Sequence, residues 1–97
     1  MPPSIHLVAT FRAKAGQEEA LKTVLTSLVA PTRRELGCIR YDLLQSMASP
    51  AEFCFIERCD SQEALDQHVA SQHITSTLPK ALELADEPPQ GRRYLLV

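Results

Sequence analysis

The chain of 97 residues contains no tryptophan, only three glycines and only three cysteines. The cysteines, Cys38, Cys54 and Cys59, are an odd number and lack Cys-x-x-Cys spacing. This pattern fits a reducing compartment better than a disulfide-stabilised scaffold. The N-terminus also lacks the charged segment and apolar core of a signal peptide. We therefore expect a cytoplasmic protein in which the thiols act mainly as small buried hydrophobic groups.

Long apolar runs, a strong charge imbalance and nucleotide-binding motifs are also missing. No stretch of about 18 apolar residues exists, so no segment is predicted to span a bilayer. A formal net charge of −2 gives no electrostatic case for binding nucleic acid or an anionic membrane. The sequence has no Walker motif, glycine-rich phosphate loop or dinucleotide fingerprint. We therefore expect no nucleic acid or membrane partner, and nothing in the sequence supports a nucleotide or flavin cofactor.

The stretch from Ala51 to Ser71 predicts a strand that leads directly into a helix. One side of the strand, at a period of two, carries Phe53, Phe55, Glu57 and Cys59. Asp60 and Ser61 are suited to cap the helix that follows. One face of that helix, at helical spacing, carries Ala64, Leu65, His68 and Val69. An imidazole on an apolar helix face thus follows a strand with a carboxylate at its middle, and a pocket between the two elements would be lined by both.

The remaining elements are predicted from the same two periodicities. Strands are expected at 4–12, 38–47 and 91–97, and a first helix at 17–35, which Pro31 should kink or restart. Beyond a break at 71–73, another helical pattern begins, and Pro79 would bend a continuous helix there. One face of the second strand is expected to carry Ile39, Tyr41, Leu43 and Met47, and the other Cys38, Arg40, Asp42 and Leu44.

The predicted order of elements is β-α-β-β-α-β, which is the α+β, ferredoxin-like arrangement with an antiparallel sheet. A chain of this length is expected to form one domain, 1–97. Helices should cover one face of the sheet. Because apolar residues also occur on the opposite face, we expect two copies to associate through their sheets as a homodimer.

His68 is the residue with the clearest potential for chemistry. It is the histidine that the helical pattern places on a buried stripe, and an ordinary pKa near 6.5 suits a general base. The alternative is a core histidine whose ring is satisfied by a backbone carbonyl.

Glu57 and the other histidines leave further alternatives open. Glu57 could accept a proton if it is desolvated, or could pair across the sheet with an arginine such as Arg40 or bond at a dimer seam. His73 follows His68 by five residues, which is not the spacing of a helical zinc site, and no third ligand is evident. We therefore expect no metal. His6 is expected at an interface or a sheet edge.

Three stretches resemble the antibiotic biosynthesis monooxygenase domain family, which includes the bacterial quinol monooxygenases. They are F-R-A-K-A-G-Q-E-E-A-L, A-P-T-R-R-E-L-G-C-I-R-Y-D-L and P-A-E-F-C-F-I-E-R-C-D-S-Q-E-A-L-D-Q-H. The resemblance implies a dimeric α/β-barrel of ferredoxin-like protomers. It also implies oxidation of a phenolic or quinol-like aromatic substrate with O2, without metal or flavin. In such chemistry the protein deprotonates the substrate, and the substrate anion supplies the electron to oxygen.

The same resemblance implies roles for particular residues. His68 matches a pocket histidine and is the candidate base, while the expected pocket comprises Tyr41, Phe53, Phe55, Glu57, Cys59 and His73. Many relatives have a tryptophan where this chain has Cys59, so the pocket should be larger or differently shaped. One alternative is an isomerase that moves a proton in a small phosphorylated dione, with Arg40 near the phosphate. Another is a non-catalytic dimeric module that binds a small molecule.

Overall fold

A computed structural model describes residues 3–97 of the chain. The strands in this part are β1 (Ile5–Arg12), β2 (Cys38–Gln45), β3 (Glu52–Cys59) and β4 (Gln90–Tyr94). The helices are α1 (Glu18–Thr26), α2 (Val29–Arg33), α3 (Gln62–Val69) and α4 (Gln72–Leu84). The predicted helix at 17–35 is thus divided into α1 and α2, while α3 and α4 are separated near the predicted break at 71–73.

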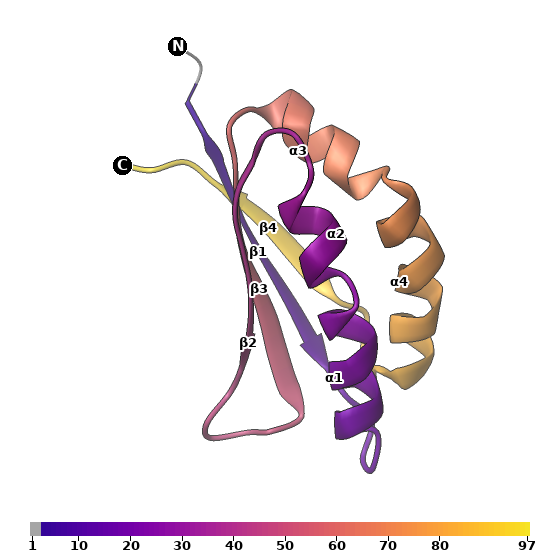
Figure 1. Cartoon of the computed structure of the whole chain (residues 1–97). Coiled ribbons are helices and arrows are strands. Elements are labelled where there is room, and N and C mark those ends of the chain that lie inside the picture. Colours follow the sequence, from indigo (N-terminus) through magenta and orange to yellow (C-terminus); the bar gives the residue numbers. More distant parts are fainter. Residues whose placement is uncertain (1–2) are drawn as a thin grey trace.

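The four strands form one antiparallel sheet in the order β2-β3-β1-β4. Figure 1 shows the helices on one side of this sheet and no helix on the other side. The predicted α+β ferredoxin-like fold is therefore confirmed. We call the uncovered side the open face. The C-terminal residues after β4 project toward this side (Figure 1).

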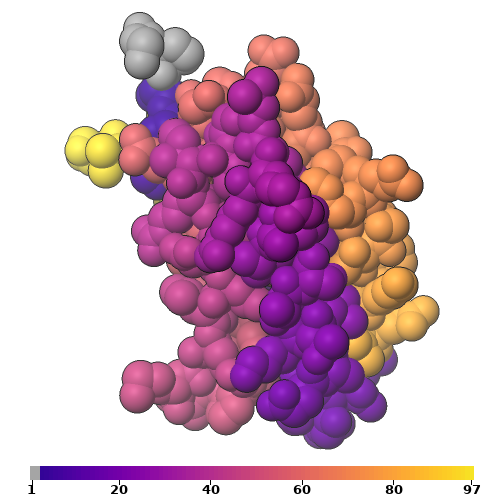
Figure 2. Space-filling view, in the orientation of Figure 1, coloured from indigo at the N-terminus to yellow at the C-terminus, as the bar shows by residue number. Residues whose placement is uncertain are grey.

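The core lies between the sheet and the helices, as the period of two in β3 predicts. Phe53, Phe55, Glu57 and Cys59 are buried, while residues 52 and 58 of the same strand are exposed. Helix α1 places Leu21 and Leu25 against this face, and both side chains are fully buried. Figure 2 shows the purple α1–α2 segment and the orange α4 segment meeting along the front of the molecule. No helix within residues 3–97 is both long enough and apolar enough to cross a membrane.

Pro31 and Pro79, the two prolines expected to disturb helices, affect their helices differently. α2 begins two residues before Pro31, so the proline falls in the first turn, where its missing N–H removes no helical hydrogen bond. The predicted restart of the helix is therefore confirmed. α4, in contrast, continues through Pro79 to Leu84, although the proline removes one internal hydrogen bond. The second strand ends at Gln45 rather than at 47, and the last strand ends at Tyr94 rather than at 97.

A change of register in β2 alters the faces predicted for that strand. The shift lies between Cys38 and Arg40, and it places Cys38 opposite Cys59. Cys38 packs against the core, whereas Ile39 is 52% exposed. The strict alternation predicted here was wrong, because a bulge inserts one residue and changes which side chains face inward.

Candidate functional site

A cavity of about 200 Å³ lies between the sheet and the helices. Its walls are mostly aliphatic and aromatic side chains from β1, β2, β3, α1, α3 and α4. The acid–base groups on the wall are Glu57 and His68, and among residues 3–97 no lysine or arginine lines it. The predicted pocket between sheet and helix thus exists, with an imidazole and a carboxylate in an apolar surrounding.

His68 reaches the cavity from the last turn of α3. The hydroxyl of Ser61 caps the start of this helix by accepting a hydrogen bond of 3.1 Å from the amide of Ala64, so the predicted capping is confirmed at Ser61. Leu65 and His68 turn inward together, and the His68 side chain is only 4% exposed. Because the carbonyl end of a helix favours a cation, this position stabilises a protonated imidazole.

The carboxylate of Glu35 holds the Nδ1 atom of His68, with both of its oxygens 2.9 Å from that nitrogen. Glu35 lies in the turn between α2 and β2, just before Gly37. The φ angle of Gly37 is +88°, and a Cβ atom there would lie 2.8 Å from the Cβ atom of Ala64. Glycine is needed because the turn takes a left-handed conformation directly against α3. This close approach brings Glu35 to His68.

Glu57 lies on the other side of the imidazole ring. Its Oε1 atom is 3.2 Å from the Nε2 atom of His68, which is within ion-pair distance. The same buried oxygen has no hydrogen-bond partner of good geometry among residues 3–97. The predicted pairing of Glu57 with Arg40 is not found, since Arg40 donates to Asp42 at 2.7 Å. A backbone carbonyl partner for the ring is not found either, because carboxylates flank both of its nitrogens.

These two carboxylates determine the protonation of His68. Burial by itself lowers the pKa of the imidazole, because the charged ring loses hydration. The close contacts that Glu57 and Glu35 make with the ring, and the charges of these carboxylates, oppose this effect and exceed it, so the pKa of His68 is raised above 6.5. With Nδ1–H donating to Glu35, loss of one proton leaves Nε2 as a free acceptor beside Glu57.

His73, near the start of α4, contacts the same carboxylate as His68. Its Nε2 atom lies 2.5 Å from the Oε2 atom of Glu35, and the Ser71 hydroxyl oxygen is 3.2 Å from the same nitrogen. Ser71 also donates a hydrogen bond of 2.6 Å to the backbone carbonyl of His68. His73 is 25% exposed and is not part of the cavity wall. The structure therefore places this predicted wall residue behind the imidazole, on the solvent side.

Glu35, His68 and His73 are also the residues here that could hold a metal ion. One donor atom of each lies within 4.8 Å of the others, and imidazole and carboxylate are ligand types that suit zinc or iron. Both histidine nitrogens are nevertheless within hydrogen-bond distance of the single carboxylate. Hydrogen bonding therefore accounts for the convergence of the three side chains without an ion.

Tyr41 and Phe55 lie on the wall of the cavity with Phe11. Their rings stack with centroids 4.7 Å apart, and Tyr41 meets the ring of His68 edge-on at 5.4 Å. Burial, assisted by the charge of Glu57, raises the pKa of the Tyr41 hydroxyl. The hydroxyl therefore stays neutral, and Tyr41 can donate a hydrogen bond but does not supply a phenolate base.

Phe53 and Cys59 are buried on the predicted face of β3 but are not part of this cavity wall. Phe53 belongs to the core cluster that contains Phe11, and Cys59 packs with Leu7 and Leu65. Burial raises the pKa of the Cys59 thiol to about 11. Cys59 is therefore a neutral core side chain, and it does not line the cavity beside His68.

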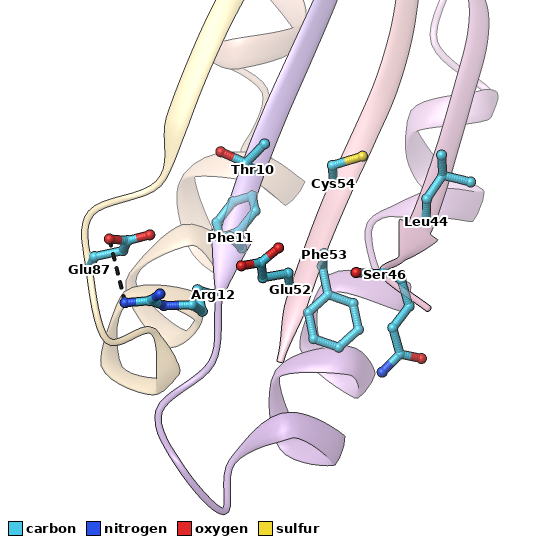
Figure 3. A pocket seen from close by; sticks show the side chains of 10 residues that line it. Thr10, Phe11, Arg12, Leu44, Ser46, Glu52, Phe53, Cys54 and Glu87 are labelled. Atoms are coloured by element: carbon cyan, nitrogen blue, oxygen red, sulfur yellow. Dashed lines mark ion pairs between the residues drawn. The ribbon is translucent and has the colours of Figure 1, made fainter. Parts of the chain in front are cut away.

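A larger hollow, of about 530 Å³, lies at the other end of the sheet (Figure 3). Side chains of β1, β2 and β3 line it, and an ion pair of 3.8 Å joins Arg12 to Glu87 at its rim. No histidine contributes to this hollow. It therefore lacks the buried acid–base pair that distinguishes the smaller cavity.

Residues 4–79 match the family model described as antibiotic biosynthesis monooxygenase. The chain is also 34% identical over 88 residues to the Mycobacterium tuberculosis protein named "Putative monooxygenase Rv0793", a match that covers 91% of this chain and 86% of the relative. The chain belongs to the antibiotic biosynthesis monooxygenase family. The resemblance seen in the sequence is thereby confirmed.

Solved structures of similar proteins share the fold over nearly their whole length. Protein SO0527 from Shewanella oneidensis is 36% identical, with a TM-score of 0.92 over 99% of this chain and 93% of that one. PA3566 from Pseudomonas aeruginosa is 31% identical, with a TM-score of 0.92 over 100% of this chain and 97% of that one. The ferredoxin-like fold is therefore shared with these proteins.

In this member of the antibiotic biosynthesis monooxygenase family, Glu35 is the site residue that sequence reasoning missed. It is 33 positions from His68, so no helical or strand period connects the two. The one available signal was its place just before a glycine that leads into a strand. A turn of that kind can pack against the helix that follows the neighbouring strand.

Proposed function

We propose that this chain is a cofactor-independent monooxygenase that oxidises a phenolic or quinol-like small molecule with O2. One observation carries the proposal. A buried histidine, bound through Nδ1 to a carboxylate, lines an apolar, aromatic-walled cavity together with Glu57, which faces its other nitrogen. Membership of the family, and the monooxygenase name of one relative, support the same reaction type.

In the proposed reaction, His68 is the base. A substrate hydroxyl enters the cavity, and its proton moves to Nε2, so that an O–H bond breaks and an N–H bond forms. The resulting imidazolium stabilises the phenolate, since the two Glu carboxylates already favour the charged ring. The electron-rich anion then reduces O2. One oxygen atom of O2 becomes a carbonyl oxygen on the ring. The other leaves as water, which takes up the hydroxyl hydrogen and one ring hydrogen of the substrate.

The cavity favours a small and uncharged substrate. Its volume of about 200 Å³ is below the range of about 300–1,000 Å³ that is usual for drug-sized ligands, which suits a single substituted ring. Apolar walls keep water away from the reacting anion, so the charge of the base acts at low dielectric. Tyr41 and Phe55 offer stacking surfaces to such a ring.

The same features argue against the phosphorylated dione of the isomerase alternative. Within residues 3–97 no lysine or arginine lines the cavity, and the carboxylates of Glu35 and Glu57 would repel a phosphate. Arg40 is paired with Asp42 away from the cavity. The monooxygenase is therefore the better supported of the two enzymatic functions.

We also propose that the chain acts as a homodimer that forms through the open face. Val8 and Ile56 are only partly buried on this face, and Leu95 and Leu96 beside them are 60% and 83% exposed. A second copy would cover these apolar side chains. The dimer would also add buried surface to a chain of a size that gains little from its own core.

The test is oxygen uptake with a panel of hydroquinones and polyphenols. Metal-stripped protein is used, autoxidation is subtracted, and the products are identified by mass spectrometry with ¹⁸O2. We expect protein-dependent uptake and one labelled oxygen atom per product. His68→Ala should reduce the rate by about 10²–10⁴-fold, because it removes a general base. Gln72→Ala, at an exposed position of α4 outside the cavity, is the control and should retain the rate.

Other outcomes would point away from this function. Turnover without oxygen, with exchange of substrate hydrogen for solvent deuterium, would indicate the isomerase. A metabolite that co-purifies and is returned unchanged would indicate a binding module. A His68→Ala variant that works at nearly the wild-type rate would contradict the role of the base.

A further inference from the structure

We propose that Glu35 and His73 form the outer half of a proton path that connects the cavity to the surface through His68. This inference rests on the proposed function, because it assigns a route to the proton that His68 takes from the substrate. It goes further by giving roles to two residues that do not line the cavity.

The contacts form a continuous series. Glu57 Oε1 lies 3.2 Å from His68 Nε2, and His68 Nδ1 lies 2.9 Å from the carboxylate of Glu35. Glu35 Oε2 in turn lies 2.5 Å from His73 Nε2. Each contact joins two groups that can gain or lose a proton. An imidazole can accept a proton at one nitrogen and release another from its second nitrogen, so His68 can pass a proton across its ring.

The exposure of the side chains increases in the same order. Glu57 and His68 are each 4% exposed, Glu35 is 17% exposed and His73 is 25% exposed. The inner end of the series is therefore closed to water and adjoins the cavity, while the outer end meets solvent. An ion-pair cluster with a purely structural role does not require exposure to increase along the series. A proton path does require it, because the proton must start in the cavity and end in solvent.

The steps balance as proton transfers without any other reactant. A substrate O–H gives its proton to His68 Nε2, and His68 gives the proton on Nδ1 to Glu35. Glu35 then gives a proton to His73 in the tautomer whose Nε2 is bare, and His73 releases one to water. The hydroxyl of Ser71 donates to the His68 carbonyl, and its oxygen, 3.2 Å from His73 Nε2, can accept a hydrogen bond from that nitrogen once it is protonated. Glu35 also orients His68, so it is a positioning residue as well.

The experiment measures proton release directly and does not depend on oxidation. Under anaerobic conditions, stopped-flow mixing brings the protein together with 4-cyanophenol in weak buffer at a pH below the pKa of the free phenol. Phenolate formation is followed by its absorbance, and proton release by a pH indicator. The low background absorbance of a chain without tryptophan helps this measurement.

We expect His73→Gln to slow proton release by at least about tenfold while leaving affinity for the phenol unchanged. Glutamine can still donate a hydrogen bond to Glu35, but it cannot carry a proton. Added imidazole should restore the rate in proportion to its concentration. The neighbouring variant Gln72→Ala, at an exposed position of α4, is the matched control and should behave like wild type.

Two results would overturn the path. One is wild-type proton release in His73→Gln. The other is slower release that imidazole does not restore and that accompanies weaker binding, which would indicate a structural role for His73. Neither result depends on oxygen uptake, so the two proposals can fail separately. If the wild-type protein consumes no oxygen but imidazole restores proton release in His73→Gln, the proposed function is rejected and the proton path is retained.

Discussion

The protonation of His68 depends on two carboxylates that come from distant parts of the chain. Periodicity alone predicted His68 on the buried stripe of its helix, because that spacing is local. Periodicity also predicted Glu57 on the inner face of its strand. Glu35 was not predicted, since its contact with His68 depends on how one turn packs against another helix. The buried histidine could therefore be predicted from sequence, while the carboxylate that binds its Nδ1 atom could not.

The position of Cys59 differs from the one that its motif suggested. Its place in the motif suggested a pocket wall, because many relatives have a tryptophan there. In the fold it packs with Leu7 and Leu65 instead. The alternation of β3 correctly predicted that the side chain points inward, but one face of a strand can serve both a cavity and solid core.

The raised pKa of His68 predicts how stability changes with pH. Because the folded pKa lies above the unfolded value of about 6.5, the contribution is fully present below that value and is lost as pH rises through the folded pKa. The difference in unfolding free energy between wild type and His68→Gln should therefore be larger near pH 6 than near pH 9. Urea unfolding at a fixed protein concentration measures this difference.

An opposite trend would contradict this assignment. If the difference grew with pH, burial would exceed the effect of the two carboxylates, and the pKa of His68 would be lowered. Glu63→Gln, on the exposed surface of the same helix, is the control and should show a much smaller dependence.

At the scale of elements, the turn between α2 and β2 is the feature that assembles the site. The number and order of the strands followed from the period of two, and Ser61 was recognised as a cap from its chemistry. The bulge after Cys38 and the continuation of α4 through Pro79 were not predicted, because tertiary packing determined both. Local patterns thus identified the elements, while contacts between elements set their details.

Substitution of Gly37 tests the role of this turn. Gly37→Ala combines an unfavourable left-handed backbone with a Cβ placed 2.8 Å from that of Ala64. We expect a loss of about 1–3 kcal/mol in unfolding free energy, together with a His68 ring that is less firmly held by Glu35. Thermal or urea unfolding measures the first effect, and the NMR titration of His68 measures the second.

Gly16→Ala is the matched control for this change. Gly16 has nearly the same φ, +84°, but a Cβ there would have no heavy atom of residues 3–97 within 4 Å. It should show only the cost of the backbone conformation and should leave the titration of His68 unchanged. Equal losses in the two variants would mean that the close approach of the turn to α3 is unimportant.

At the scale of the whole molecule, the uncovered sheet face is the surface through which we propose that the homodimer forms. We expect light scattering at micromolar concentration to give twice the mass of one chain. Ile56→Glu should shift this mass toward that of a monomer, because it puts a charge on the open face. Leu82→Glu, at an exposed apolar position of α4, is the control and should leave the mass unchanged. A wild-type chain that is monomeric under these conditions would contradict the proposed dimer.

The most direct test of the central claim is an anaerobic absorbance titration of 4-cyanophenol bound to the protein. If His68 takes the proton of a phenol in the apolar cavity, the bound probe should ionise at a lower pH than the free probe. In His68→Ala this shift should disappear, while the control variant Gln72→Ala, at an exposed position of α4 outside the cavity, should retain it. Ionisation of the bound probe to the same extent in wild type and His68→Ala would show that another group is the base.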